Sequence, residues 1–203
     1  MNSQPAFASE AEARAALTID DVRAAAERIE GAVVRTPMMH SITLSEIAGC
    51  EIWLKFENLQ FTAAYKERGA LNALLHLTDE QRQRGVIAAS AGNHSQGLSY
   101  HGTRLGVPVT IVMPRTTPQI KVDAVRRLGA RVQLHGDSFD EAATRARELE
   151  KSRGLIFVHP FDDPDVIAER ERAERVGAEP QLDAAAGEDH QIPPDVEGDD
   201  RYQ

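Results

Sequence analysis

Between residues 66 and 159, apolar positions follow two alternating patterns. Short apolar runs, typical of buried strands, alternate with stretches in which apolar residues recur every three or four positions, as on one face of a helix. The pattern predicts strands at residues 85–90, 107–113, 131–135 and 155–159, with helices at 66–77, 94–105, 118–128 and 139–151. Strands that alternate with helices of this length are typical of the α/β class, in which helices cover a parallel sheet. Such sheets bind ligands at the carboxyl ends of their strands.

The part of the chain before residue 66 is less regular. Thr18 and two acids that follow it, Asp20 and Asp21, predict a helix that ends near Gly31. A short helix at residues 41–48 and a strand at 51–56 come next. The chain has a single cysteine, Cys50, so an internal disulfide is excluded. Because Cys50 lies in an apolar stretch beside this strand, we expect its thiol to be packed against other residues.

Both ends of the chain differ from this central part. Residues 1–17 are rich in alanine and predict a disordered start, whereas residues 169–203 are acidic, contain proline and hold few large apolar side chains. A segment of that composition cannot bury enough apolar surface to offset the entropy lost on ordering. We therefore expect one folded domain at residues 18–168, followed by a disordered acidic tail at 169–203.

The distribution of charge narrows the class of partner. Of the net charge of −9, residues 169–203 hold −7, from 11 acids against 4 arginines, which leaves −2 for the rest. A nearly neutral body without a basic stripe indicates neither a nucleic-acid partner nor a membrane surface, so a small molecule is favoured. The sequence has no apolar run long enough to span a membrane and no secretory leader, which favours the cytoplasm. Its histidines show no metal-ligand spacing, so we expect no metal site.

Lys66 is the first candidate for chemistry. Among Lys55, Lys66, Lys121 and Lys151, only Lys66 begins a predicted helix directly after a loop. The positive field at a helix N-terminus favours the neutral amine, the form that nucleophilic chemistry and Schiff-base formation need. By position alone, an ordinary exposed lysine is the simpler interpretation.

The second candidate is a turn in which a predicted strand runs directly into a helix. It consists of Ser90, Ala91, Gly92, Asn93 and His94. Backbone N–H groups and the helix dipole at such a turn attract a carboxylate or a phosphate. Asn93 adds a neutral donor. Taken alone, a turn of this kind is more often only capping structure.

Five short motifs occur together in an order and spacing that indicate one family. They are Asn58-Leu59-Gln60, Tyr65-Lys66-Glu67-Arg68-Gly69-Ala70, Ser90-Ala91-Gly92-Asn93-His94, Met113-Pro114 with Thr117-Pro118 and Lys121, and His159-Pro160-Phe161-Asp162. Residues 18–168 resemble the threonine dehydratases (threonine ammonia-lyases), which are pyridoxal-phosphate enzymes of the tryptophan synthase beta-like fold. The resemblance implies that this region is the lysine-bearing N-terminal part of such an enzyme: its small domain, with an incomplete large domain.

The resemblance also implies roles for individual residues. Lys66 would condense with the aldehyde of pyridoxal 5'-phosphate and later remove the alpha proton of the substrate. Asn93 would hydrogen-bond the ring hydroxyl of the cofactor, and the turn from Ser90 to His94, with Ala91 and Gly92, would hold the substrate carboxylate. Loss of the beta hydroxyl from threonine or serine would then give a 2-oxo acid and ammonia.

Two residues of the turn narrow the reaction within this class. His94 after Asn93 is similar to the dehydratases, whereas cysteine synthases usually carry a threonine there. Ala91 has no proton to donate where serine racemases use a serine as the acid on the opposite face, which disfavours racemisation.

The chain also departs from the family pattern. Ala64 stands where the family usually has a serine, which removes a polar group near the reacting centre. The glycine loop that cradles the cofactor phosphate would lie beyond Ala168, where the family pattern ends. We therefore expect a truncated dehydratase whose activity alone is weak or absent. The alternatives are a non-catalytic fragment that binds anions or pairs with a full-length relative, and a product without function. Substrate preference between threonine and serine, allosteric control and assembly into a homo-oligomer stay open.

Overall fold

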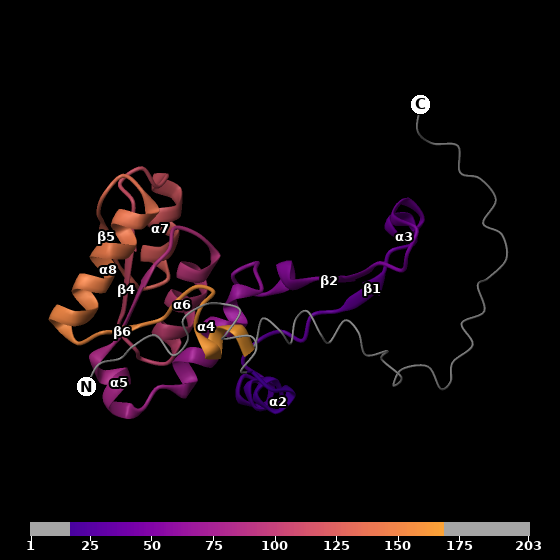
Figure 1. Cartoon of the computed structure of the whole chain (residues 1–203), viewed down its shortest axis with the longest axis horizontal. Coiled ribbons are helices and arrows are strands. Elements are labelled where there is room, and N and C mark those ends of the chain that lie inside the picture. The colour runs from indigo at the N-terminus through magenta and orange to yellow at the C-terminus, as the bar shows by residue number, and fades with distance from the viewer. Residues whose placement is uncertain (1–16, 169–203) are drawn as a thin grey trace, which may run out of the picture.

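A computed structural model describes residues 17–168 of the chain. Its centre is a four-stranded sheet in the order β5-β4-β3-β6, with all neighbouring strands parallel (Figure 1). The strands are β3 (Val86–Ala89), β4 (Val109–Met113), β5 (Arg131–Leu134) and β6 (Ile156–Phe157). Val86 of β3 lies opposite Val109 on one side and Ile156 on the other. The predicted parallel, helix-covered sheet is confirmed.

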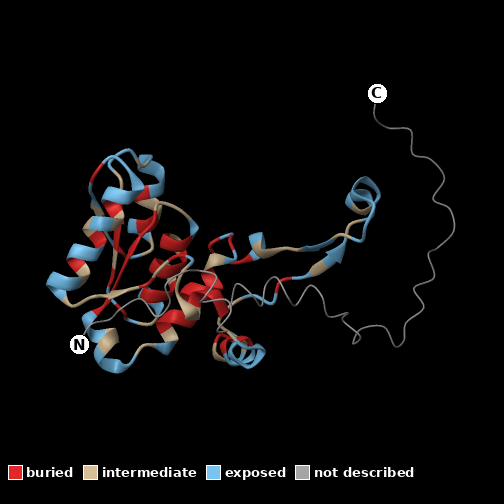
Figure 2. Cartoon of the chain, viewed as in Figure 1, coloured by how far each residue is buried: buried red, intermediate tan, exposed pale blue. Residues whose placement is uncertain are grey.

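Helices cover both faces of the sheet because successive side chains of a strand point to opposite sides. Val86 and Ala88 pack in one cluster with α4 (Lys66–His76), α6 (Asn93–Arg104) and α7 (Gln119–Arg127). Ile87 and Ala89 pack on the other face against α8 (Phe139–Arg153). All four residues of β3 are therefore buried, within the red central layer of Figure 2. Burial on both faces explains why this strand reads as a continuous apolar run.

An antiparallel ribbon extends away from this body (Figure 1). We call residues 38–55 the arm: β1 (Met38–His40), α3 (Ile42–Ala48) and β2 (Trp53–Lys55), with α3 at the far end. The short helix η1 (Glu57–Leu59) follows. No residue of α3 is buried, and Ile47 is 78% exposed. Cys50 is exposed as well, so the predicted packed thiol is wrong. Its apolar neighbours in the sequence are themselves on the surface of the arm.

The predicted helices are confirmed with small changes at their ends. α2 (Ile19–Arg28) begins after Thr18, which exchanges hydrogen bonds with Asp21 in a capping box. Three short elements were not predicted: β1, η1 and α5 (Asp79–Arg84). For α5 a signal was present, because Thr78 and Gln81 form the same kind of cap. The predictions of disorder fall on residues 1–16 and 169–203, which lie outside the described part of the chain. Within residues 17–168, no helix is long and apolar enough to cross a membrane.

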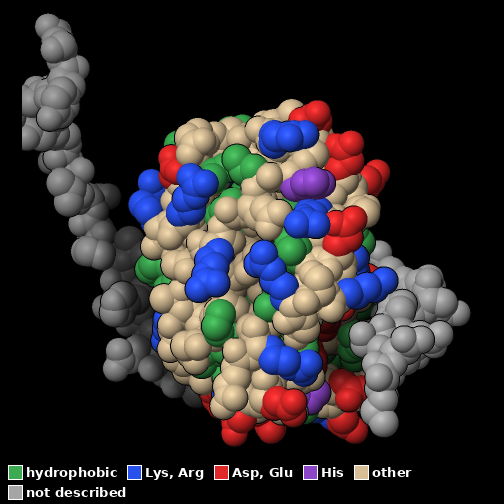
Figure 3. Space-filling view, turned by 90° about the vertical axis from the view of Figure 1, so that its left-hand side faces the viewer, with side chains coloured by type: hydrophobic (Ala, Val, Ile, Leu, Met, Phe, Trp, Pro, Cys, Tyr) green, Lys and Arg blue, Asp and Glu red, His purple; other side chains and the backbone are tan. Residues whose placement is uncertain are grey.

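Figure 3 shows the side of the molecule that carries α5 and α8 in Figure 1. Lys and Arg side chains are spread over this face among uncharged atoms, with acidic side chains towards its margins. Two arginines of α8 have partners on the same helix: Arg145 lies 2.7 Å from Glu148 and Arg147 lies 3.1 Å from Glu150. Exposed pairs of this spacing add little stability, but they reduce the local positive charge.

Candidate functional site

Lys66 is the first residue of α4, and a tight loop leads into it. Ala63 in this loop has a φ of 54°, in the left-handed region that residues other than glycine rarely adopt. Thr62 is fixed by the carboxylate of Glu67, which accepts from its backbone N–H at 2.7 Å and from its hydroxyl at 2.8 Å. The loop therefore has a defined shape that sets the start of the helix.

The amine of Lys66 points towards the loop that follows β6. Its Nζ donates a hydrogen bond of 2.6 Å to the carbonyl oxygen of Pro160 and lies 5.2 Å from the centroid of the Tyr65 ring. The side chain is partly buried, so Lys66 is not an ordinary exposed lysine. Pro160 is 94 residues away in the sequence, and the contact exists because β6 lies next to β3 in the sheet.

The loop after β6 is shaped by its own side chains. His159 Nδ1 accepts a hydrogen bond of 2.9 Å from the backbone N–H of Asp162, which closes the turn around Pro160. The Asp163 carboxylate accepts from the N–H groups of Asp165 and Val166 at the start of the next helical turn. Burial, together with the nearby charge of Asp165, raises the pKa of Asp163 to about 6.

The turn after β3 forms as predicted, with Gly92 as the N-cap of α6 and Asn93 as its first residue. No side chain caps this helix, so the first N–H groups of α6 are not covered by a cap of their own. Within the turn, Ser90 Oγ accepts from the Gly92 N–H at 3.3 Å, and Ser95 Oγ donates to the Gly92 carbonyl at 2.6 Å. A helix start of this kind suits an anion.

These two elements meet in one cavity of about 330 Å³ at the carboxyl end of β3. This volume is at the lower end of small-molecule pockets, about 300–1,000 Å³. The predicted residues that line it are Lys66, Ser90, Ala91, Asn93 and His94, whereas Gly92 is not among the lining residues and acts as the helix cap. Residues that the sequence analysis did not single out also line it: Tyr65, Ala89, Phe139, Pro160 and Phe161. Apart from Ala89 and Phe139, these lie in the quoted motifs around Lys66 and His159.

His94, one of the residues that line this cavity, is buried and has one ring nitrogen without a partner among the described residues. It is 3% exposed, and its Nε2 lies 3.2 Å from the carbonyl oxygen of Val158. Because a carbonyl only accepts, Nε2 carries the hydrogen and Nδ1 is left as an acceptor. Burial lowers the pKa of His94 to about 4, and the positive charge of Lys66 acts in the same direction. The ring is therefore neutral at neutral pH, and Nδ1 has no partner within the described residues.

Comparisons with known proteins show the family and the fold. A family model described as "Pyridoxal-phosphate dependent enzyme" matches residues 29–177. The chain is 49% identical over 152 residues to an L-threonine ammonia-lyase of Thermotoga maritima. The aligned residues make up 75% of this chain and 38% of that relative. It is also similar to the solved structures of two proteins. Threonine deaminase isoform 2 of Solanum lycopersicum has a TM-score of 0.69 and 39% identity, over 85% of this chain and 47% of that chain. Serine racemase of Dictyostelium discoideum has a TM-score of 0.72 and 35% identity, and the match covers 77% of this chain and 51% of the racemase chain.

These similarities confirm the resemblance drawn from the five motifs, including its fold. The chain spans less than half the length of curated relatives that it matches, 38% of the Thermotoga maritima protein and 44% of an L-threonine dehydratase of Staphylococcus aureus.

Proposed function

Because the chain belongs to the family of pyridoxal-phosphate dependent enzymes, we propose that Lys66 is the residue to which the cofactor attaches. The proposed reaction is removal of water and then ammonia from threonine or serine, giving a 2-oxo acid. The observation that carries this proposal is the shared cavity, in which the Lys66 amine and the turn from Ser90 to His94 line the same space.

The residues present suit the aldehyde and ring end of the cofactor. A partly buried primary amine lies at the wall of a cavity of adequate size, and Asn93 lies at its rim as an exposed donor. The unpaired Nδ1 of His94 is a further reason to expect a ligand, since buried acceptors in native proteins rarely lack a donor. When bound, pyridoxal phosphate supplies the electron sink for bond breaking at the substrate alpha carbon.

The side chains and N–H groups at the cavity would then remove the proton and hold the substrate and the ring. Lys66, when its amine is free and neutral, would take the proton from the alpha carbon as a general base. The N–H groups at the start of α6 bind the substrate carboxylate, and Asn93 orients the bound ring by a hydrogen bond. His94 stays neutral at neutral pH and so adds no positive charge beside the Lys66 amine.

Dehydration is favoured over racemisation at this site. Racemisation needs a second acid on the face opposite the lysine. Ala91 lines the cavity where serine racemases carry that acid, and a methyl group has no proton to give. The similarity to a serine racemase therefore supports the fold and the cofactor more than the racemase reaction.

The test is spectroscopic and comes before any assay of turnover. Purified chain is mixed with pyridoxal phosphate, and we expect an absorbance band of covalently attached cofactor near the visible region that is lost in Lys66→Ala. Lys121→Ala, which removes an exposed lysine of α7, is the matched control and should keep the band. A band that persists in Lys66→Ala would refute the proposal.

Turnover is read separately, as release of 2-oxobutyrate from threonine. The chain covers less than half of its curated relative, and we expect weak or no turnover by the 203-residue chain alone. If neither attachment nor turnover is found, the alternative is favoured, a non-catalytic fragment that binds anions or pairs with a full-length relative.

A further inference from the structure

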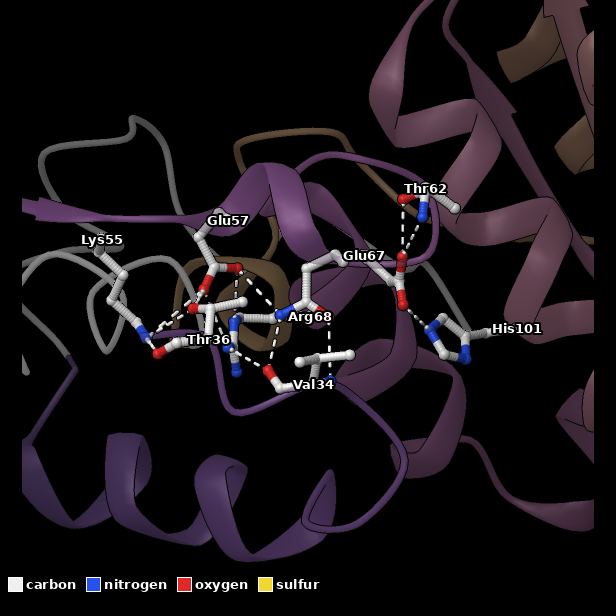
Figure 4. A network of polar contacts seen from close by, with 9 residues as sticks. Val34, Thr36, Lys55, Glu57, Thr62, Glu67, Arg68 and His101 are labelled. Atoms are coloured by element: carbon white, nitrogen blue, oxygen red, sulfur yellow. Dashed lines mark hydrogen bonds and ion pairs between the residues drawn. The ribbon is translucent and has the colours of Figure 1, made fainter. Parts of the chain in front are cut away.

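Two buried charged residues follow Lys66 directly. Glu67 is 2% exposed and Arg68 is 4% exposed, and both belong to the first turn of α4. Burying a charge costs free energy unless the charge is paired and hydrogen-bonded. Figure 4 shows that their partners lie on opposite sides: Glu57 and Thr36 near Arg68, and Thr62 and His101 near Glu67. The start of α4 is therefore held from two directions.

Arg68 binds Glu57 at two points. Its Nε lies 2.7 Å from Glu57 Oε2 and its second terminal nitrogen lies 2.9 Å from Oε1, while the same nitrogen also donates to the Val34 carbonyl at 2.9 Å. Burial alone would raise the pKa of Glu57, but hydrogen bonds from Arg68 and Thr36 and the charges of Arg68 and Lys55 outweigh it and lower the pKa. Planar two-point contacts of this type fix orientation as well as distance. Arg68 thus ties α4 to the segment at the base of the arm.

Glu67 ties the same turn to α6. One carboxylate oxygen accepts both hydrogen bonds from Thr62, and the other lies 3.5 Å from His101 Nε2. This last distance is long for a hydrogen bond, so the contact is mainly electrostatic. His101 is 1% exposed and belongs to the helix that begins at Asn93. Burial would raise the pKa of Glu67, yet its partners hold the pKa below the usual value.

The backbones of the two helices also meet at this point. A Cβ atom on Gly97 would lie 3.0 Å from the Cα of Glu67 and 3.3 Å from the carbonyl oxygen of Lys66. Glycine therefore allows α6 to pack directly on the backbone that carries Lys66. The position of the lysine relative to the Asn93 turn is set by one close backbone contact and by the buried contact between Glu67 and His101.

We propose that Glu67 and Arg68 are positioning residues, which hold Lys66 at the cavity without touching a ligand. The inference rests on the proposed function, in which Lys66 is the reacting amine. Lysine has a long flexible side chain, so its reach is decided by where its backbone starts. A shift of the first turn of α4 would carry the amine away from both the Pro160 carbonyl and the turn after β3. Reactions that depend on such placement are sensitive to displacements of about 1 Å, which can cost on the order of 100-fold in rate.

The experiment compares two lysines within one molecule. The full 203-residue chain is treated with pyridoxal phosphate and borohydride, and attachment at Lys66 is divided by attachment at the exposed Lys121, using peptide mass spectrometry. Glu67→Ala, Arg68→Ala and Gly97→Ala should each lower this ratio at least about tenfold, because each displaces the amine. Glu67→Gln keeps an oxygen that can accept from Thr62 and should recover most of the ratio.

Leu149→Ala is the matched structural control. Leu149 is 2% exposed and packs on the opposite face of the sheet, so its truncation leaves a cavity far from α4. It should lower the unfolding midpoint and leave the ratio unchanged. Should Glu67→Ala or Arg68→Ala not fold, Arg68→Lys carries the same expectation, because it keeps the charge and loses the two-point contact.

The outcomes separate this inference from the proposed function. If the unmodified chain shows no preference for Lys66 over Lys121, the proposed function fails. If the preference is present but folded Glu67→Ala and Arg68→Ala retain it, or if Leu149→Ala lowers it as much, the positioning role is overturned.

Discussion

Ala63 holds backbone strain directly before the candidate reactive lysine. Its φ of 54° costs an alanine about 1–2 kcal/mol, whereas glycine adopts this region freely. The strain is tolerated because Thr62 on one side and the start of α4 on the other fix the loop. Strained residues of this kind concentrate at functional sites.

Ala63→Gly should therefore stabilise the protein slightly. We expect the free energy of unfolding to rise by about 0.5 kcal/mol, the strain relieved less the greater backbone entropy of glycine in the unfolded chain. Denaturant unfolding measures this change. Ala143→Gly, within α8, is the control and should lower stability by about 1 kcal/mol. Equal losses in both variants would show that the loop is not strained.

Asp163 predicts a pH dependence of stability. Its pKa of about 6 in the folded chain lies above the usual value of 3.8, so folding favours the protonated carboxyl. The stability it contributes is complete below about pH 4 and is lost as the pH rises through about 6, by at most about 3 kcal/mol. Asp163→Asn keeps an oxygen that can accept from Asp165 and Val166 but cannot ionise.

Unfolding of the chain and of Asp163→Asn at about pH 4 and about pH 7 tests this directly. The variant should gain stability relative to the original chain as the pH rises, since only the original residue must bury a charge. A difference that is the same at both pH values would exclude the raised pKa.

At the scale of elements, α3 and α4 differ most in how far their side chains are buried. α4 buries eight residues in sequence, from Glu67 to Leu74, because one side packs on the sheet and another on α6. α3 buries none. An isolated two-stranded ribbon is marginally stable in water. At the base of the arm, Lys55 donates hydrogen bonds to the carbonyl oxygen and the hydroxyl of Thr36, which join the two chain segments of the ribbon.

Substitutions in these two helices should differ sharply in cost. Leu74→Ala, at a fully buried position, should lower the free energy of unfolding by about 2–5 kcal/mol. Ile47→Asp, at a position that is 78% exposed, should change it by no more than about 0.5 kcal/mol. Denaturant unfolding followed by circular dichroism gives both values. A large loss in Ile47→Asp would mean that α3 is covered in solution, for example by another copy of the chain.

At the scale of the whole molecule, cofactor binding should be visible as stability. A ligand that binds only the folded state at about 100 times its dissociation constant stabilises that state by about 2.7 kcal/mol. Pyridoxal phosphate should therefore raise the free energy of unfolding of the original chain and of Lys121→Ala by this amount, and much less for Lys66→Ala. Thermal and denaturant unfolding with and without the cofactor provide the measurement. A similar rise in Lys66→Ala would indicate binding that does not involve the lysine.

The sequence by itself determined the fold class and, apart from α5, the order of strands and helices from residue 66 onwards. It also indicated Lys66 and the Ser90–His94 turn as candidates. These follow from local signals: apolar periodicity, the cap at Thr18, and a strand that runs directly into a helix at Gly92. The same kind of signal at Thr78 went unused, which is why α5 was missed.

Only the tertiary structure decided which of these residues meet. Contacts between residues far apart in the chain build the site. They are Lys66 with Pro160, the wall supplied by Phe139, Arg68 with Val34, and Glu67 with His101. Burial was likewise not a local property: Cys50 and Ile47 lie in an apolar stretch yet are exposed, whereas Glu67 and Arg68 are charged yet buried. Whether a side chain leaves water depends on which distant segments pack around it, and nothing in its own neighbourhood in the sequence records that.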